Sequence, residues 1–177
     1  MVEVHKVSGA AFDGNVYLVL DEKPILVDAG MMAGPTLKNI KKFIDPAKIE
    51  LIVLTHCHHD HSGAAPALKE ATGARLMLSE KEVGCIGDEL ASVAYLFGQQ
   101  APEYKVDETL KEGMVLDIGK WNLEVMETPG HSTGSLCLMS GRKRCYSPEI
   151  QYSLTVTSAG RICSAEAPTN WPAPSRG

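Results

Sequence analysis

The densest group of chemically capable side chains lies in the stretch LTHCHHDHSG, residues 54–63. Four of the six histidines of the chain, together with one aspartate, occupy six consecutive positions there. Imidazole and carboxylate groups both bind zinc well, at distances of about 2.0–2.2 Å. Surface histidines in a polar loop are the alternative interpretation, but so dense a cluster beside an aspartate favours a metal site.

The spacing within this stretch predicts which side chains converge. His56 and His58 lie two positions apart, directly after the apolar run 51–54, which is typical of a buried strand. In an extended backbone such residues point the same way, so both imidazoles should face one ion. Asp60 and His61 follow where the chain turns towards Gly63, and we expect them to aim at a second point beside the first.

A third imidazole comes from a distant segment. His131 lies in the phrase TPGHSTGS, just after an expected strand over residues 121–127. Alone it is more typical of a loop residue than of a ligand, but with His56 and His58 it completes a set of three nitrogens. Three protein ligands with a fourth position left for water is the catalytic arrangement of zinc.

The elements that must position these residues alternate along the chain. Apolar periodicity predicts strands over residues 1–7, 15–20, 24–30, 49–54, 74–79, 114–119, 121–130 and 134–141, with a further strand beginning within 142–146. Helical spacing predicts helices over residues 35–44 and from 63 to 73, and glycine-interrupted helical patterns over 79–100. Helices and strands that interleave first, with strands dominating later, predict an α/β (α+β) fold of αββα layers.

The composition fits a soluble globular protein and narrows its partners. The chain has 177 residues, 44% of them apolar, and a net charge of −5, which argues against nucleic acid as the main partner. No apolar run approaches the roughly 18 residues of a membrane span, and MVEVHKVSG does not resemble a signal peptide. The five scattered cysteines fit a reducing compartment, so we expect a cytoplasmic protein without membrane contact.

Three phrases carry a family resemblance. THCHHDHSG resembles the HxHxDH signature of the metallo-β-lactamase superfamily, VDAG at 27–30 resembles its first motif, and TPGHSTGS its third. The resemblance covers residues 2–144 and implies an αββα sandwich with a two-metal site. By this matching His56, His58 and His131 hold the first metal, and Asp60 and His61 hold the second. Zinc is the expected metal, with iron or manganese as alternatives.

The remainder of the chain departs from that family pattern. The family has a bridging aspartate in a Gly-Asp turn and a further histidine, but neither a Gly-Asp pair nor a histidine follows His131. Residues 145–177 hold four of the ten prolines and read as a disordered tail after a domain over residues 1–144. We therefore expect an incomplete second half of the sandwich and a poorly occupied second metal site.

A change of reading frame is one hypothesis for the departure. One permitted choice of codons for residues 145–171, read from the last base of the Cys145 codon, encodes LLTGDTVFSDGYFGRADLLSGSADQL. This phrase contains the absent GDT and the FGRADL typical of glyoxalase II-like members. The hypothesis is that residues from about Cys145 onward are out of frame through loss of one base; a diverged natural tail is the alternative.

The resemblance implies a zinc-dependent hydrolase of the glyoxalase II-like branch, in which metal-activated water attacks a thioester or similar small acyl substrate. Asp60 is the expected catalytic residue, orienting the nucleophile and accepting its proton besides ligating. A lactonase and an iron-dependent sulfur dioxygenase are alternatives on the same scaffold. A truncated, metal-binding but catalytically inactive chain is an alternative of another class, and the oligomeric state stays open.

Side chains around the motifs have two interpretations each. Alternation predicts that Cys57 and His59 point away from the metals. Hydroxyl groups near the histidines either donate to the ligands or serve ordinary turns: Thr55, Ser62, Ser132 and Thr133. Aromatic side chains between the metal motifs either line the substrate cleft or, as we favour, pack into the core: Tyr95, Phe97 and Tyr104.

Overall fold

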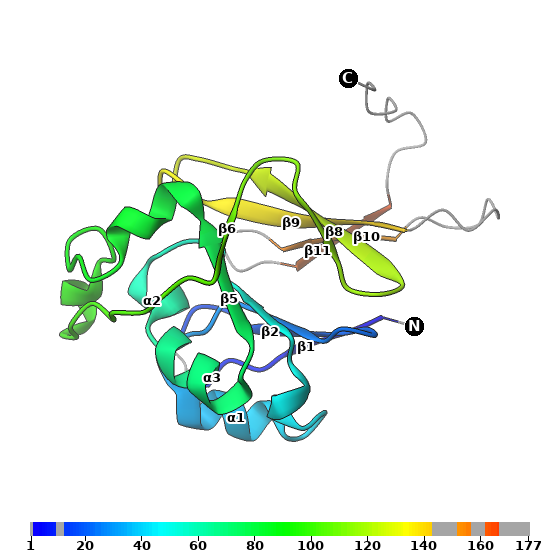
Figure 1. Ribbon diagram of the computed structural model, residues 1–177, viewed down its shortest axis with the longest axis horizontal. Coiled ribbons are helices and arrows are strands. Elements are labelled where there is room, and N and C mark those ends of the chain that lie inside the picture. Colours follow the sequence, from blue (N-terminus) through cyan, green and yellow to red (C-terminus); the bar gives the residue numbers. More distant parts are fainter. Residues whose placement is uncertain (1, 10–12, 143–151, 157–161, 167–177) are drawn as a thin grey trace.

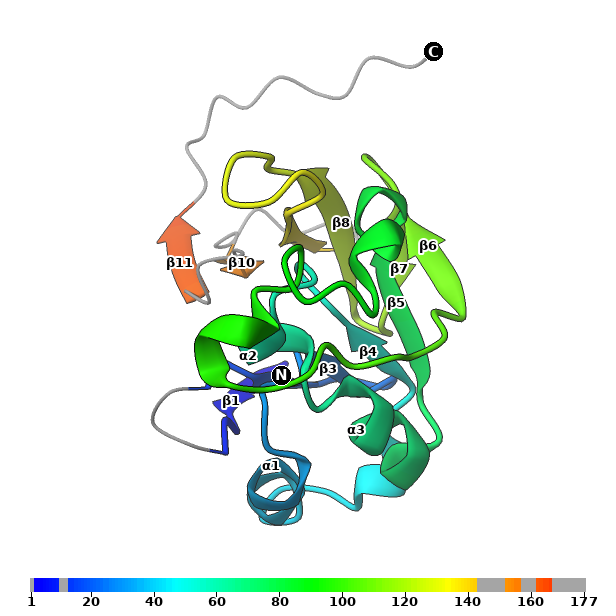
Figure 2. The same ribbon diagram turned by 90° about the vertical axis from the view of Figure 1, so that its left-hand side faces the viewer.

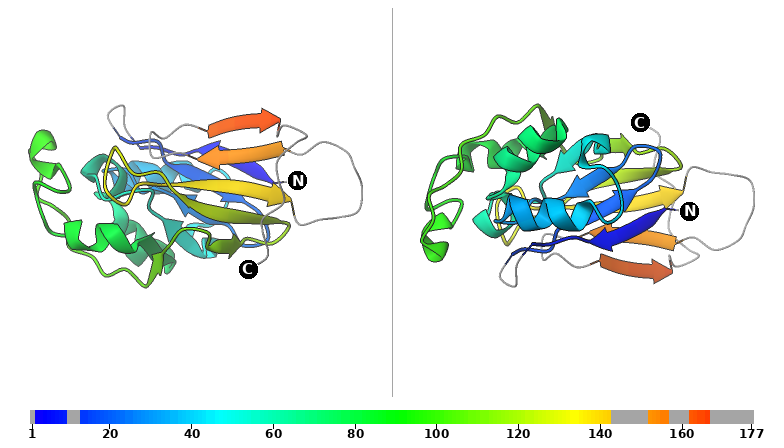
Figure 3. Two further views of the ribbon diagram at one scale, coloured as in Figure 1. Left: turned by 90° about the horizontal axis from the view of Figure 1, so that it is seen from above. Right: turned by 90° about the horizontal axis from the view of Figure 1, so that it is seen from below.

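The computed structural model describes residues 2–9, 13–142, 152–156 and 162–166. Within these ranges two β-sheets lie face to face, and helices lie against the outer face of the first sheet (Figures 1 and 2). No α-helix among the described residues covers the outer face of the second sheet, as the view from above shows (Figure 3, left). The predicted α/β layering, with two sheets face to face and helices over the first of them, is therefore confirmed.

The first sheet has six strands in the order of the chain: β1 (Glu3–Lys6), β2 (Tyr17–Leu20), β3 (Ile25–Val27), β4 (Leu51–Val53), β5 (Arg75–Ser79) and β6 (Glu108–Leu110). The strands from β1 to β3 pair antiparallel, whereas those from β3 to β6 pair parallel. The carboxyl ends of strands β3, β4 and β5 therefore lie side by side, and ligands usually bind at this end of the strands in α/β proteins.

The second sheet has five antiparallel strands in the order β11-β10-β9-β8-β7: β7 (Val115–Asp117), β8 (Trp121–Glu127), β9 (Leu136–Arg142), β10 (Tyr152–Val156) and β11 (Ile162–Glu166). The longest pairing joins β8 to β9, from Trp121 opposite Arg142 to Glu127 opposite Leu136. The turn between these two strands holds His131.

The helical segments are short. They are α1 (Ala33–Ile40), η1 (Pro46–Lys48), α2 (His59–Ser62), α3 (Ala65–Thr72), η2 (Glu80–Cys85) and η3 (Ala94–Phe97). As predicted, α3 ends at Gly73, whose backbone adopts the left-handed conformation (φ 73°) that terminates many helices.

The core has two layers because the first sheet is buried on both faces. Leu51 and Val53 of β4 face the second sheet and pack in a cluster with Leu123 and Val125 of β8. Between them, Ile52 points the other way and joins the cluster beneath α1 and α3. This two-sided burial explains why the sequence of β4 is continuously apolar rather than alternating.

Several element predictions were wrong in their bounds. The helix expected over 35–44 is α1, which ends at Ile40, and residues 79–100 form the short 3₁₀ segments η2 and η3. Strand β6 was missed because Leu110 is its only buried residue, so no periodicity marks it. Disorder was expected over 145–177, but β10 and β11 are strands. Residues 143–151, 157–161 and 167–177, and with them most of the strand expected from 142–146, lie outside the described residues.

Candidate metal centre

Three of the predicted imidazoles meet beside the carboxyl end of β4. His56 and His58 follow β4, and His131 comes from the turn between β8 and β9. The ring centroids lie 4.6 Å apart for His56 and His58, 4.8 Å for His56 and His131, and 4.5 Å for His58 and His131. One ring nitrogen from each lies within 4.8 Å of the other two. The distant segments thus supply three nitrogens to one point.

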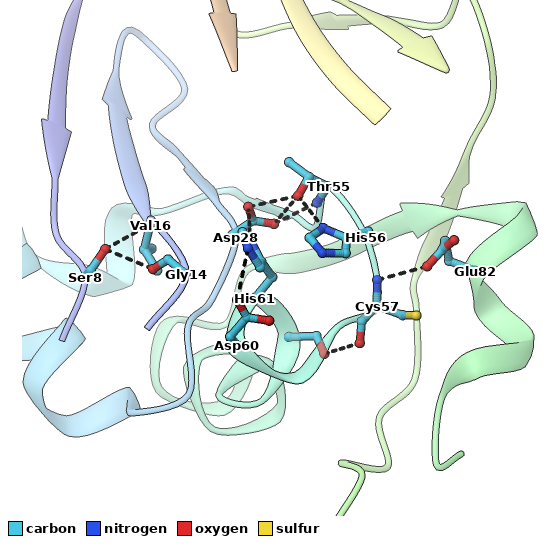
Figure 4. A network of polar contacts seen from close by, with 11 residues as sticks. Ser8, Gly14, Val16, Asp28, Thr55, His56, Cys57, Asp60, His61 and Glu82 are labelled. Carbon is cyan, nitrogen blue, oxygen red and sulfur yellow. Dashed lines mark hydrogen bonds and ion pairs between the residues drawn. The ribbon is translucent and has the colours of Figure 1, made fainter. Parts of the chain in front are cut away.

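The two nitrogens of His56 have different surroundings. Nδ1 lies 3.0 Å from Oγ1 of Thr55, which also lies 3.0 Å from each carboxylate oxygen of Asp28 (Figure 4). Because a carboxylate only accepts hydrogen bonds, we infer that the Thr55 hydroxyl donates to Asp28 and accepts from Nδ1–H of His56. Nε2 of His56 is then an acceptor, and it is buried without a hydrogen-bond partner. A bound cation would satisfy this nitrogen.

Asp60 and His61 lie beside this group. The rings of His61 and His56 are 4.3 Å apart, and Nε2 of His61 is 3.4 Å from Oδ2 of Asp60. The other nitrogen of His61, Nδ1, lies 2.8 Å from Oδ2 of Asp28 (Figure 4). The buried Asp28 therefore orients His61 directly and His56 through Thr55, as carboxylates commonly do behind metal-binding histidines.

The protonation of these histidines suits cation binding at the first point. Burial, reinforced by the neighbouring His61, His58 and His131, lowers the pKa of His56 to about 2. Burial and His131 also lower the pKa of His58. Burial alone would lower the pKa of His61, but Asp28 outweighs it and raises that pKa. His56 and His58 are thus neutral at pH 7, the state in which imidazole binds metals.

The donor sets of the two points differ in size. The three imidazoles fit a divalent metal such as zinc with one coordination position left over, and the unpartnered Nε2 of His56 supports that fit. At the second point Asp60 and His61 supply two donors, and among the described residues no further histidine, cysteine, aspartate or glutamate forms a three-donor group with them. Two ligands hold a divalent cation weakly.

A second group of possible donors, Cys57, Glu82 and Cys85, also lies within 4.8 Å. Here both oxygens of Glu82 already accept protein hydrogen bonds, from the backbone N–H groups of Cys57 and Gly134. Burial alone would raise the pKa of Glu82, but hydrogen bonds from Cys57, Gly134 and Ser132 outweigh it and lower that pKa. Glu82 had not been predicted, because SEKEVG is typical of a solvated surface turn.

The other side chains singled out in the sequence either point away from the three histidines or bond groups other than the candidate ligands, with one exception. Cys57 is buried with Sγ directed to the carbonyl oxygen of Ala91, and His59 lies outside the three-histidine group, as alternation predicted. Of the four hydroxyl groups, only that of Thr55 has a described hydrogen bond to one of the candidate ligands. Ser62 instead bonds the carbonyl oxygen of Cys57, Ser132 pairs with Ser135, and Thr133 reaches Glu82.

An open pocket of about 490 Å³ adjoins α2 on the side of His59, and its lining residues are Met31, Met32, His59, Phe97 and Gln99. Phe97 therefore faces this pocket, whereas Tyr104 packs against the core as expected. Tyr95 does neither, since 53% of its surface is exposed.

The fold and the histidine group define a class of protein, and comparison with known sequences agrees. The profile of the metallo-beta-lactamase superfamily matches residues 9–146. The chain belongs to this superfamily.

Individual relatives are similar at modest identity. A probable metallo-hydrolase of Methanocaldococcus jannaschii is 31% identical over 139 residues, which are 76% of this chain and 66% of the relative. The hydroxyacylglutathione hydrolase GloC of Haemophilus influenzae is 27% identical over 138 residues, covering 76% of this chain and 64% of that protein. The chain thus spans slightly less than two thirds of these relatives.

A solved structure gives the same result for the fold. BJP-1, a subclass B3 metallo-beta-lactamase of Bradyrhizobium japonicum, superposes with a TM-score of 0.70 and 27% identity. The match covers 88% of this chain and 61% of BJP-1. None of the helices in the described part of the chain has the length and hydropathy needed to cross a membrane.

Proposed function

We propose that this chain carries the metal centre of a zinc-dependent hydrolase that acts on a small acyl thioester. In this proposal His56, His58 and His131 hold the first zinc ion, and Asp60 and His61 contribute to a second site. The observation that carries the proposal is the convergence of one ring nitrogen from each of the three imidazoles within 4.8 Å, beside the buried Nε2 of His56 that has no hydrogen-bond partner.

In the proposed reaction, Asp60 acts on the attacking water, and Asp28 and Thr55 hold the histidines in place. Zinc, when bound, lowers the pKa of water towards neutrality and polarises an acyl carbonyl group. Asp60, whose side chain is 28% exposed and therefore reachable by substrate, orients the attacking water and accepts its proton. The acyl–sulfur bond breaks, and the products are a carboxylic acid and a thiol. Asp28 and Thr55 hydrogen-bond Nδ1 of His61 and of His56, which would leave Nε2 of both rings to hold the metals.

The thioester class is supported by a relative. GloC is named a hydroxyacylglutathione hydrolase, and a hydroxyacylglutathione is an acyl thioester. The out-of-frame phrase containing FGRADL points to the same glyoxalase II-like branch. A small-molecule acyl substrate is thus the proposed partner, and the acidic net charge of −5 accords with a site that does not bind nucleic acid.

A second candidate function is metal binding without turnover. Among the described histidine, cysteine, aspartate and glutamate side chains, no third one joins Asp60 and His61 in a donor group, so the second point should hold a cation poorly. We further propose that residues from about Cys145 onward are out of frame and that the shifted frame encodes the missing Gly-Asp ligand. Resequencing the gene around codon 145 tests this directly; a DNA sequence unable to encode the GDT phrase in the shifted frame removes the idea.

Metal analysis of the purified chain beside a frame-restored version tests the function. Both are stripped with a chelator, dialysed against zinc and assayed with a hydroxyacylglutathione by release of free thiol. We expect one zinc ion and little turnover for this chain, and two zinc ions with thioester cleavage for the restored chain. Absence of zinc from both forms would overturn the metal centre; two ions without cleavage would overturn the thioesterase.

A further inference from the structure

We propose that Glu82 is a positioning residue, which joins the segment carrying His131 to the segment carrying His56 and His58. This inference rests on the proposed function, because those three imidazoles are the proposed zinc ligands. Glu82 touches none of them directly, and it acts through the backbone beside them.

The carboxylate of Glu82 holds both segments at once. Oε2 accepts a hydrogen bond of 3.0 Å from the backbone N–H of Cys57, which stands between the two histidines (Figure 4). Oε1 accepts a hydrogen bond of 2.6 Å from the backbone N–H of Gly134, three residues after His131. The hydroxyl of Thr133 lies 3.4 Å from the same oxygen. One side chain thus bridges two segments that are far apart in the sequence.

Because Glu82 is buried, its carboxylate needs these hydrogen bonds to be stable in the folded chain. Glu82 has no exposed surface, and a buried carboxylate is costly unless donors satisfy it. Its hydrogen bonds to N–H groups are of the charge-assisted kind, which are about twice as strong as neutral ones. The carboxylate and the two segments therefore hold each other in place.

Steric space at Gly134 supports the same conclusion. A Cβ atom at this position would lie 2.6 Å from Cγ of Glu82 and 2.9 Å from both Cβ of Lys81 and Oγ of Ser79. Only a residue without a side chain can approach Glu82 so closely. The backbone N–H of Leu136 also donates to the carbonyl oxygen of Thr55, at 3.0 Å, which brings the turn against the same loop.

His131 needs such a connection more than its partners do. His56 is buried and held by Thr55, whereas His131 is exposed and lies in a turn. Other hydrogen bonds of this turn close it on itself, since Thr128 N–H donates to the carbonyl oxygen of Ser135 and the hydroxyls of Ser132 and Ser135 are 2.7 Å apart. Together with the Leu136–Thr55 hydrogen bond at the end of the turn, Glu82 therefore sets where the turn lies relative to the other two imidazoles.

Two variants with matched controls test the proposal. E82Q removes the charge and places an amide donor against the N–H groups, whereas E80Q changes an exposed neighbour that pairs only with Lys111 among its described ion pairs. G134A keeps the carboxylate but forces the turn away from it; G34A is its control, because a Cβ at Gly34 meets no atom within 4 Å.

Zinc affinity and amide hydrogen exchange are the measurements, both on the full chain. Zinc affinity is taken by competition with a chromophoric chelator, and exchange is followed in the metal-free protein at the amides of Cys57 and Gly134. E82Q and G134A should lower zinc affinity by about 10–100-fold, the usual effect of losing an outer partner of a metal site. E82Q should speed both exchange rates by about 10-fold or more, as expected for loss of a charge-assisted hydrogen bond. The controls should stay within about twofold of wild type.

The outcomes separate this proposal from the proposed function. Wild-type zinc affinity in E82Q or in G134A, with folding intact, would show that Glu82 does not position His131 and would overturn the inference. If E82Q does not fold, G134A alone decides. If the wild-type chain binds no zinc, the proposed function fails, and unchanged exchange at Cys57 and Gly134 in E82Q would overturn the bridge separately.

Discussion

Oδ2 of Asp28 lies 2.8 Å from Nδ1 of His61, and Asp28 is fully buried just beyond the end of β3. The same carboxylate accepts the backbone N–H of Thr55 at 2.7 Å and its hydroxyl at 3.0 Å. It therefore ties the end of β3 to the loop after β4 and orients histidines of both proposed metal sites. Asp28 has a positive φ of 62°, a conformation in which aspartate and asparagine are enriched.

Replacing Asp28 with asparagine isolates its charge, because asparagine accepts the same backbone conformation. We expect D28N to lower the free energy of unfolding by roughly 1.5–3 kcal/mol, the contribution of hydrogen bonds to a charged group. Urea unfolding of the metal-free protein measures this. D117N is the control, since Asp117 is exposed and lies 3.9 Å from Lys23, so its loss should cost at most about 1 kcal/mol. Equal stabilities of the two variants would contradict the role of Asp28.

Removing His131 should separate metal binding from folding. Because its ring is exposed, H131A should change the unfolding free energy of the metal-free chain by no more than about 0.5 kcal/mol. Zinc affinity should fall by more than about 100-fold, since loss of a ligand exceeds loss of an outer partner. His5, which stacks on Phe43 away from the site, supplies the control H5A with wild-type affinity. Comparable zinc binding by H131A and H5A would exclude His131 as a ligand.

Much of the site could be predicted from sequence because its spacing is local. His56 and His58 follow an apolar strand two positions apart, and Asp60 and His61 come directly after them in α2, so short-range chain geometry brings all four side chains to the carboxyl end of β4. The approach of His131 is long-range, and it was predicted from the chemistry of a three-nitrogen set. The apolar run of β4 likewise predicted a strand buried on both faces.

Other features depended on contacts that no local pattern records. Glu82 lies among charged residues, and its burial arises only because the β8–β9 turn folds over it. Strand β6 has one buried side chain, so its pairing with β5 and not its own periodicity makes it a strand. Strands β10 and β11 come from a segment whose composition indicated disorder, and they form by adding to the edge of the second sheet at β9.

Stability of the metal-free chain should fall as pH decreases below about 6.5. The pKa of His56 is lowered from 6.5 to about 2, first by burial and then by His61, His58 and His131, so the unfolded chain takes up a proton that the folded chain refuses. The free energy of unfolding then drops by up to about 1.4 kcal/mol per pH unit from this group. The lowered pKa of His58 acts in the same direction.

His61 acts in the opposite direction. Its pKa is raised by Asp28, so its contribution is fully present below the unfolded value and is lost as pH rises through the folded value. Burial also lowers the pKa of His59, so three histidines act against His61, and we expect a net loss of stability on the acid side. Urea unfolding with chelator at several pH values between about 7 and 5 measures this loss. H56Q should show a shallower dependence than wild type. An identical slope in H56Q would show that burial of His56 is not the cause.

The approach of Gly14 to the second metal point gives a further prediction. Its backbone N–H donates to the carbonyl oxygen of Asp60 at 2.9 Å, and an added Cβ would lie 2.7 Å from that oxygen and 2.8 Å from the ring of His61. G14A should therefore destabilise the chain by about 1–3 kcal/mol, as overpacking does. G34A, in open space within α1, should instead stabilise it by roughly 0.5–1 kcal/mol, because alanine favours the helix.

The position of His61 makes this test specific to the site. The overlap in G14A falls on Cδ2 and Nε2 of the ring, so the ring should shift and weaken its hydrogen bond to Asp28. In proton NMR spectra the resonance of Nδ1–H of His61 should then move upfield or exchange faster, and G34A should leave it unchanged. If G14A is as stable as wild type and keeps this resonance, the loop before β2 does not support the second metal point, and Asp28 alone holds His61 in place.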